Sequence, residues 1–101
     1  MYYVCENYQL FDRFYHNGNL SSCKSSNSII DLFRYLADRP FVRDVRSYEL
    51  KDLRLKYHSS HSINDHFYNI YLITVDCCGK ENYLKKYHLP QALCYLVELI
   101  D

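Results

Sequence analysis

The stretch "DLRLKYHSSHSINDHFYNIYLITVDCC", Asp52 to Cys78, decides the fold of this 101-residue chain. In "DLRLKYH" apolar and polar residues alternate, and the apolar positions are Leu53, Leu55 and Tyr57. Neighbouring side chains of a strand point to opposite faces of the sheet. The alternation therefore predicts a half-buried strand that directs Arg54 and Lys56 to solvent.

The second half of the stretch predicts a long strand from Phe67 to Cys77. Apolar residues occur at both odd and even positions of this segment. Both faces of the strand should therefore be covered, as they are for a strand inside a sheet. The connection between the two strands, Ser59 to Asp65, is rich in serine, and together the two strands predict an antiparallel hairpin.

Three of the five histidines, His58, His61 and His66, lie around this predicted connection. With Asp65 they could surround a zinc ion, since imidazole nitrogens and carboxylate oxygens are zinc ligands. A connection rich in serine and asparagine lacks the rigid frame of a metal site, so we interpret the histidines as a solvated polar tip. We therefore predict that the chain holds no metal and no cofactor.

The segments before the hairpin add further elements. "YYVC" predicts a short N-terminal strand, and Asn17-Gly18 in "LFDRFYHNGNLSSC" predicts a hairpin turn. "SSNSIIDLFRYLADRP" predicts a helix with Ser28 as its N-cap, and Pro40 is expected to stop it.

The segments after the hairpin predict a further strand, "NYLKKYHL", and a C-terminal helix, "PQALCYLVELI", with Pro90 at its first turn. The apolar stripe of that helix would be Leu93, Leu96, Val97 and Ile100. Tyr95 and Leu99 lie beyond the stripe and need cover. We expect these two residues to contact a partner, for example in a homodimer through this helix; the alternative is that the first helix or the N-terminal strand covers them within a monomer.

Together these elements predict a single domain, residues 1–101, because the chain is long enough for one modest core. The expected fold class is α+β. The expected architecture is an antiparallel sheet of three to five strands with two helices packed on one face.

Charge and hydropathy exclude several classes of protein. Lys plus Arg equals Asp plus Glu at 12 each, which argues against a strongly basic nucleic-acid binder and against a strongly acidic nucleic-acid mimic. No apolar run reaches the length of about 18 residues that a membrane helix needs. The start, "MYYVCENYQLF", lacks the features of a signal peptide, so we expect a cytoplasmic protein with no membrane partner.

The residues of common catalytic sites are missing from the sequence. The chain has no GxSxG turn, no glycine-rich phosphate loop and no HExxH helix, and it contains only two glycines. The five cysteines are odd in number and lack paired CxxC spacing, so we expect free thiols. The spacing of cysteines and histidines in the sequence does not identify any cysteine as a nucleophile with a histidine as its base. We therefore predict a protein that is not an enzyme.

Tyrosine is the outstanding feature of the composition, with 12 residues beside five phenylalanines. Tyrosine is enriched at protein interfaces because it offers a large area and a polar tip at low entropy cost. We therefore favour a non-enzymatic protein-binding module, while the tyrosines could instead only cover the strands. The alternative is a small nucleic-acid-binding module. Its basic, tyrosine-rich sheet face would consist of Arg54, Lys56, Tyr83, Lys85 and Tyr87.

Alanine, glycine and proline are rare in this chain, and tyrosine, asparagine and serine are frequent. In this bias and in its size the chain resembles the small accessory proteins of phages and mobile elements, among them anti-CRISPR proteins. The resemblance covers size and composition and includes no motif, so it assigns no residue a role. It implies an inhibitor that occludes a host defence protein, or a protein–nucleic-acid complex, in the host cytoplasm.

Overall fold

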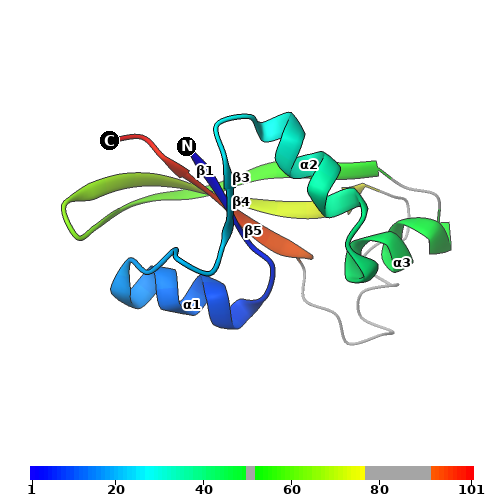
Figure 1. Cartoon of the computed structure of the whole chain (residues 1–101), viewed down its shortest axis with the longest axis horizontal. Coiled ribbons are helices and arrows are strands. Elements are labelled where there is room, and N and C mark those ends of the chain that lie inside the picture. The colour runs from blue at the N-terminus through cyan, green and yellow to red at the C-terminus, as the bar shows by residue number, and fades with distance from the viewer. Residues whose placement is uncertain (50–51, 77–91) are drawn as a thin grey trace.

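A computed structural model describes residues 1–49, 52–76 and 92–101 (Figure 1). In these residues one antiparallel sheet has the strand order β2-β1-β5-β4-β3. The strands are β1 (Tyr2–Cys5), β2 (Lys24–Ser26), β3 (Asp52–Ile63), β4 (His66–Asp76) and β5 (Cys94–Leu99). The helices are α1 (Tyr8–Asn17), α2 (Ile29–Ala37) and α3 (Pro40–Glu49). The predicted α+β class and the predicted antiparallel sheet are confirmed.

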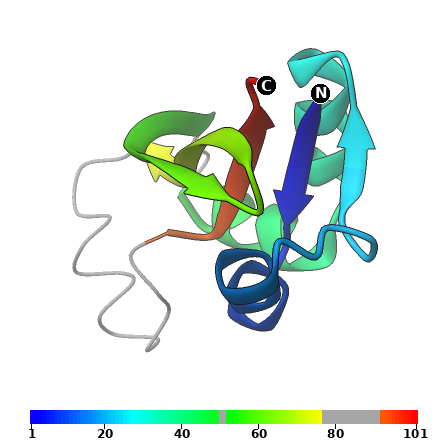
Figure 2. The same cartoon turned by 90° about the vertical axis from the view of Figure 1, so that its left-hand side faces the viewer.

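The sheet carries a hydrophobic core on each face. On the face that packs against α2 and α3, here called the α2 face, the buried side chains are those of Val4, Leu32, Leu36, Val42, Ile73, Cys94 and Leu96. On the opposite face, here called the α1 face, they are those of Cys5, Phe14, Tyr68, Ile70 and Val97. Two helices, α2 and α3, thus share one face, whereas the prediction had paired α2 with a C-terminal helix. Figure 2 shows a further helix, α1, beneath β1 and β5.

The predicted hairpin at Asn17-Gly18 is wrong, because the residues before it form α1. The Asn7 side chain caps the helix by accepting a hydrogen bond from the Leu10 amide at 2.9 Å. Gly18 ends the helix in the left-handed conformation, with φ of 69°, and its amide donates to the Phe14 carbonyl at 2.7 Å. A left-handed glycine suits a helix C-terminus as well as a hairpin turn.

The hairpin of β3 and β4 is confirmed, but its connection is much shorter than predicted. Only Asn64 and Asp65 form the turn, and both have positive φ, at 50° and 66°. The predicted loop over 59–63 is therefore wrong, since these residues pair with β4. A register shift between Tyr57 and Ser59 brings the following residues onto new faces of the strand.

Three further predictions can be compared with the structure. "YYVC" forms β1 as predicted, and the predicted long strand is β4, which lies inside the sheet. The predicted central helix is α2, capped by Ser28, whose side chain accepts from the Asp31 amide. Pro40 follows the end of α2 but also begins α3, a helix that the sequence did not predict.

The predicted C-terminal helix is wrong, because the segment forms β5. This strand pairs with β1 on one side and β4 on the other. Its side chains alternate between the two cores, with Leu96 on the α2 face and Val97 on the α1 face. The sequence of a strand buried on both faces is a continuous run of apolar residues. The spacing of apolar residues in such a run cannot distinguish a strand from a short buried helix. Pro90 and the predicted strand "NYLKKYHL" lie outside the described residues.

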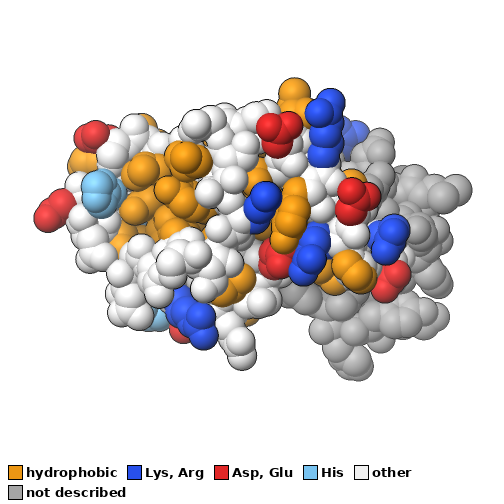
Figure 3. All heavy atoms as spheres, in the orientation of Figure 1, with side chains coloured by type: hydrophobic (Ala, Val, Ile, Leu, Met, Phe, Trp, Pro, Cys, Tyr) orange, Lys and Arg blue, Asp and Glu red, His pale blue; other side chains and the backbone are white. Residues whose placement is uncertain are grey.

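Charged side chains are unevenly distributed over the surface. In Figure 3 most of the visible lysine, arginine and acidic side chains gather toward α2 and α3, whereas an apolar area lies nearer the β3–β4 hairpin. Opposite charges are mixed at the charged end, where Arg39 lies 2.9 Å from Glu6 and Arg34 lies 3.9 Å from Asp31. Mixed charges of this kind are typical of a solvated surface.

Candidate binding surfaces

The predicted partner-binding residues do not gather at one site. Arg54 and Lys56 are exposed on β3, as expected from the alternation. Leu55 and Tyr57, which were expected on the buried face of this strand, are exposed as well, at 37% and 56%. The reason is that α2 and α3 leave this part of the sheet uncovered. Tyr83, Lys85 and Tyr87 lie outside the described residues.

Tyr95 and Leu99 do not form the predicted interface. Both belong to β5 and pack on the core of the α1 face. The ring of Tyr95 stacks on that of Phe11 with centroids 4.0 Å apart. The predicted homodimer through a C-terminal helix is therefore withdrawn, because the segment is an interior strand whose side chains are needed within the domain.

A different cluster lies on the α2 face, toward the hairpin end of the sheet. We call it the tyrosine face, and it consists of Tyr2, Tyr57, Phe67, Tyr71 and Ile100. Tyr57 lies opposite Tyr71, and their rings meet edge to face at 5.8 Å. Phe67 in β4 and Ile100, which directly follows β5, are neighbours, because the Ile100 amide donates a hydrogen bond to the Phe67 carbonyl at 2.9 Å.

The tyrosine face is exposed although its members are large and apolar. Tyr57 is 56% exposed, Phe67 is 54% exposed and Ile100 is 56% exposed. Tyr2 and Tyr71 are half-buried, because they also pack against the core beneath α2. Single exposed apolar residues are ordinary on a protein surface, but a contiguous group of them marks a contact surface.

A polar network fixes the centre of the tyrosine face. The Oε1 atom of Glu98 accepts hydrogen bonds from the Tyr71 hydroxyl and from Asn69 Nδ2, both at 3.1 Å. Ser60 donates to Asn69 Oδ1 at 2.5 Å and also contacts the Tyr57 hydroxyl at 2.7 Å. The network thus connects both tyrosine hydroxyls with one carboxylate, and this restricts the side chains to one arrangement.

Glu98 also changes the acidity of its tyrosine neighbours. Tyr2 lies opposite Glu98 in the sheet, and the negative charge of the carboxylate raises the pKa of the Tyr2 hydroxyl. Burial raises the pKa of Tyr71, and its hydrogen bond to Glu98 raises it further. Both hydroxyls therefore ionise at a higher pH than an ordinary tyrosine does.

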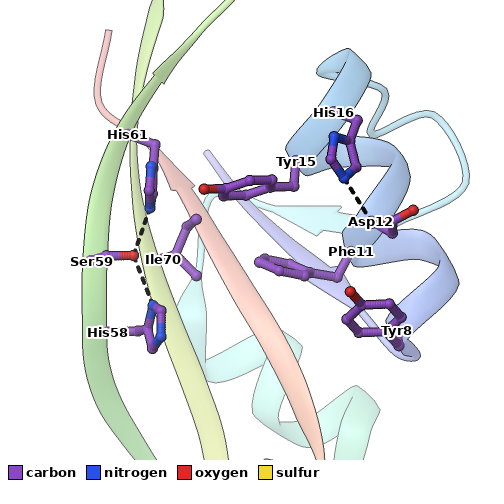
Figure 4. A pocket seen from close by; sticks show the side chains of 9 residues that line it. All are labelled: Tyr8, Phe11, Asp12, Tyr15, His16, His58, Ser59, His61 and Ile70. Carbon is purple, nitrogen blue, oxygen red and sulfur yellow. Dashed lines mark hydrogen bonds and ion pairs between the residues drawn. The ribbon is translucent and has the colours of Figure 1, made fainter.

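A groove of about 440 Å³ lies on the α1 face, between α1 and β3 (Figure 4). Figure 4 shows the rings of Tyr8, Phe11 and Tyr15 on its α1 side. On the β3 side Ser59 Oγ connects two imidazoles, at 2.8 Å from His58 Nδ1 and 2.9 Å from His61 Nε2. The ring of His61 meets that of Tyr15 edge to face at 5.2 Å. Tyr8 and Tyr15 are 67% and 42% exposed, so the aromatic side of the groove is open to solvent.

The three hairpin histidines do not surround a common point. His58 and His61 lie in β3 and line the groove, whereas His66 begins β4, where its Nδ1 lies 3.2 Å from the Asp101 carbonyl oxygen. Within residues 1–49, 52–76 and 92–101, no three His, Cys, Asp or Glu side chains are arranged to hold a metal ion. The predicted loop is wrong at His61, because β3 extends almost to the turn, whereas His58 and His66 lie in strands and are exposed to solvent.

The residues of the tyrosine face were missed by the sequence analysis for one reason. Phe67, Asn69 and Tyr71 alternate along β4, and this signal was visible. Glu98 and Ile100 join them only when the C-terminal segment is a strand, whereas the prediction placed both residues on a helix. The helix prediction therefore separated residues that the sheet brings together.

No helix in the part of the chain that the structure describes is long and apolar enough to cross a membrane. Comparison of the chain with protein-family models, with curated protein sequences and with solved structures gives no match. A function for this chain therefore has to come from the chemistry of its own surfaces.

Proposed function

We propose that this chain is a cytoplasmic, non-enzymatic protein-binding module that docks a foreign protein on the tyrosine face. The observation that carries the proposal is the exposure of Tyr57, Phe67 and Ile100 on one face, each by more than half, around the hydrogen-bonded carboxylate of Glu98. Aromatic anchors that surround a satisfied polar group are typical of the energetic centre of protein interfaces.

The chemistry of the face indicates what its partner must offer. Apolar side chains of the partner would cover Phe67 and Ile100 and remove them from water. The partner should place an arginine or a lysine beside Glu98, because a carboxylate that becomes buried needs a cation in addition to its hydrogen-bond donors. A second copy of the chain would present the same residues, and neither an arginine nor a lysine is among Tyr2, Tyr57, Phe67, Tyr71, Ile100 and Glu98. A foreign partner therefore suits the face better than a second copy does.

We further propose that the module acts as an inhibitor by occluding the surface of a host protein, as the resemblance to phage accessory proteins implies. The support is the small size of the chain, its composition, and the position of the face toward one end of an elongated molecule of 40 × 25 × 21 Å. Occlusion needs shape and affinity and requires no catalytic group.

The test begins with affinity capture of a partner from cells that naturally make the chain. The purified partner is then titrated calorimetrically with the wild type and with Phe67→Asp, Tyr57→Ala and Glu98→Gln variants. Each variant should bind at least about tenfold more weakly, because each alters a central contact. Tyr8→Ala is the matched control, since Tyr8 is also an exposed tyrosine but lies on the α1 face. A loss of affinity in the control alone would contradict the proposal.

A second candidate function uses the α1 face. There Lys56 is exposed on the same face of β3 as the aromatic groove, whose rings Tyr8 and Tyr15 are open to solvent. A single nucleic-acid strand could stack its bases on such rings while lysine contacts its phosphates. The net charge of zero counts against this candidate, and the predicted Tyr83, Lys85 and Tyr87 lie outside the described residues.

A salt series of gel shifts with single-stranded RNA and DNA separates the two candidates. Protein binding on the tyrosine face predicts no appreciable shift at physiological salt. Nucleic-acid binding in the groove predicts a salt-sensitive shift that Tyr8→Ala and Lys56→Ala weaken and Phe67→Asp leaves unchanged.

A further inference from the structure

Two cysteine thiols lie in contact at the edge of the sheet. Cys5 ends β1, and Cys23 directly precedes β2. Their Sγ atoms are 3.5 Å apart, and both residues are free thiols. The proposed binding surface uses neither of them. Both cysteines are thus in the reduced form that the sequence analysis predicted.

The register of the sheet places these two residues opposite each other. Val4 pairs with Lys24 in the antiparallel ladder of β1 and β2, so the next pair outward is Cys5 with Cys23. Opposed residues of antiparallel strands have Cα atoms about 4.5–5.5 Å apart. A disulfide spans Cα distances of about 4.4–6.8 Å. Side-chain rotation can therefore bring the sulfur atoms into bonding distance while the strand pairing is kept.

We propose that Cys5 and Cys23 form a reversible disulfide site that reacts with low-molecular-weight disulfides. The pair is a dithiol at the end of the β1–β2 ladder, with one half-buried residue and one fully buried residue. Cys5 is fully buried, while Cys23 is half-buried on the segment that leads into an edge strand.

The environments of the two thiols give them different roles. Cys23 has a lowered pKa, because the Cys5 thiol donates a hydrogen bond to its sulfur. The same hydrogen bond and burial raise the pKa of Cys5. Cys23 is thus the thiol that attacks an external disulfide, and Cys5 is the thiol that resolves the mixed disulfide.

The reaction with oxidised glutathione proceeds in two exchange steps. The Cys23 thiolate attacks one sulfur of glutathione disulfide, the sulfur–sulfur bond breaks, and one glutathione thiolate leaves. Cys5 then gives up its proton to a glutathione thiolate and attacks the Cys23 sulfur, which releases the second glutathione. Two protein thiols are oxidised to one disulfide, and one glutathione disulfide is reduced to two thiols.

The bond would close a loop that contains the whole of α1. Residues 5–23 include α1 and the segment that follows it, and α1 supplies the aromatic side of the groove. β2 has only three residues, so a covalent link at its start would also hold the edge of the sheet. A cross-link of this loop length should raise the melting temperature by roughly 12–25 °C.

The test oxidises the purified full chain with glutathione disulfide, blocks the remaining thiols with N-ethylmaleimide and maps the peptides by mass spectrometry. The expected result is two fewer maleimides per chain than in the reduced protein, a peptide pair that joins Cys5 to Cys23, and full reversal by dithiothreitol. A chain with Cys77→Ser and Cys78→Ser should behave in the same way, and Cys94 is left unchanged because it lies in the core of the α2 face. Cys23→Ser should form no such bond and should lose the increase in melting temperature.

Two outcomes would overturn the inference. In one, Cys5 is still blocked by maleimide after oxidation while other cysteines pair. In the other, glutathione stays attached to Cys23 and no internal bond replaces it. Cys23→Ser changes a half-buried residue in a connecting segment, so the comparison does not depend on a substitution at the fully buried Cys5.

Discussion

Glu98 determines the polar character of the tyrosine face, and its effect should be visible in the alkaline range. The pKa values of Tyr2 and Tyr71 are raised above the ordinary value of 10.0 in the folded chain. As the pH rises above about 10, the unfolded chain loses these protons first, so the free energy of unfolding falls until the folded hydroxyls also ionise. Urea unfolding at about pH 8 and about pH 11 should show this fall, and Glu98→Gln should reduce it.

Tyr35 provides an internal reference for that experiment. Its pKa is raised by a hydrogen bond to Glu6, which Glu98→Gln does not touch. Some alkaline loss of stability should therefore remain in the variant. If the wild type and Glu98→Gln lost the same amount of stability, Glu98 would have no part in holding these tyrosines neutral.

Gly18 lies in the left-handed backbone conformation, which favours glycine over other residues. Its φ is 69°, and a Cβ atom would lie 2.5 Å from Asn64 Nδ2, which itself donates to the Asn17 carbonyl at 2.8 Å. Gly18→Ala should therefore lower the free energy of unfolding by about 1–3 kcal/mol, from backbone strain and from a disturbed contact with the β3–β4 turn. Urea unfolding measures the loss, with the exposed Ser22→Ala as the control. Equal stability of the two variants would refute this account.

His58 and His61 supply a prediction about metal. Ser59 holds the two imidazoles in the groove, and no third ligand from the described residues joins them. We predict that the purified chain contains no stoichiometric zinc. Elemental analysis is the measurement, and about one zinc per chain that disappears in the His58→Ala, His61→Ala double variant would overturn the prediction.

β5 is the element on which the sequence and the structure differ most, and hydrogen exchange can test its assignment. The strand pairs with β1 and β4, so its backbone is enclosed on both sides. We expect the amides of Tyr95 to Val97 to exchange among the slowest of the described residues, and those of the short edge strand β2 to exchange much faster. Exchange of β5 at the rate of β2 would contradict its place in the sheet.

The elements that the sequence predicted well are those with an unambiguous local pattern. β3 begins with strict alternation of apolar and polar residues from Leu53 to His58, and α2 has a serine cap and an apolar stripe. α1 was missed because Asn17-Gly18 fits two kinds of chain reversal; the Asn7 cap and the packing of Phe14 against the sheet favour the helix. β5 was missed because "ALCYLVELI" is apolar on both faces, and only its two neighbouring strands show that it is extended.

At the level of the whole molecule, the candidate site depends on which parts of the sheet its helices cover. α2 and α3 cover one part of their face and leave Tyr57, Phe67 and Ile100 exposed. The high tyrosine content indicated an interface, but the sequence could not locate it. The tyrosine face is assembled from β1, β3, β4 and the C-terminal segment, so its location follows from the strand order β2-β1-β5-β4-β3 and from no local pattern.

Site-specific photo-crosslinking tests the proposed binding surface most directly. Phe67 and Tyr8 are replaced, in separate proteins, by p-benzoylphenylalanine, and each protein is irradiated in the cells that naturally make the chain. Both positions are exposed, but Phe67 lies on the tyrosine face and Tyr8 lies at the groove. If the tyrosine face is the binding surface, position 67 should crosslink to one foreign protein and position 8 should not. The crosslink from position 67 should disappear when Glu98→Gln is added to the same protein. Crosslinks from position 8 only, or crosslinks from position 67 to a second copy of the chain, would contradict the proposed binding surface.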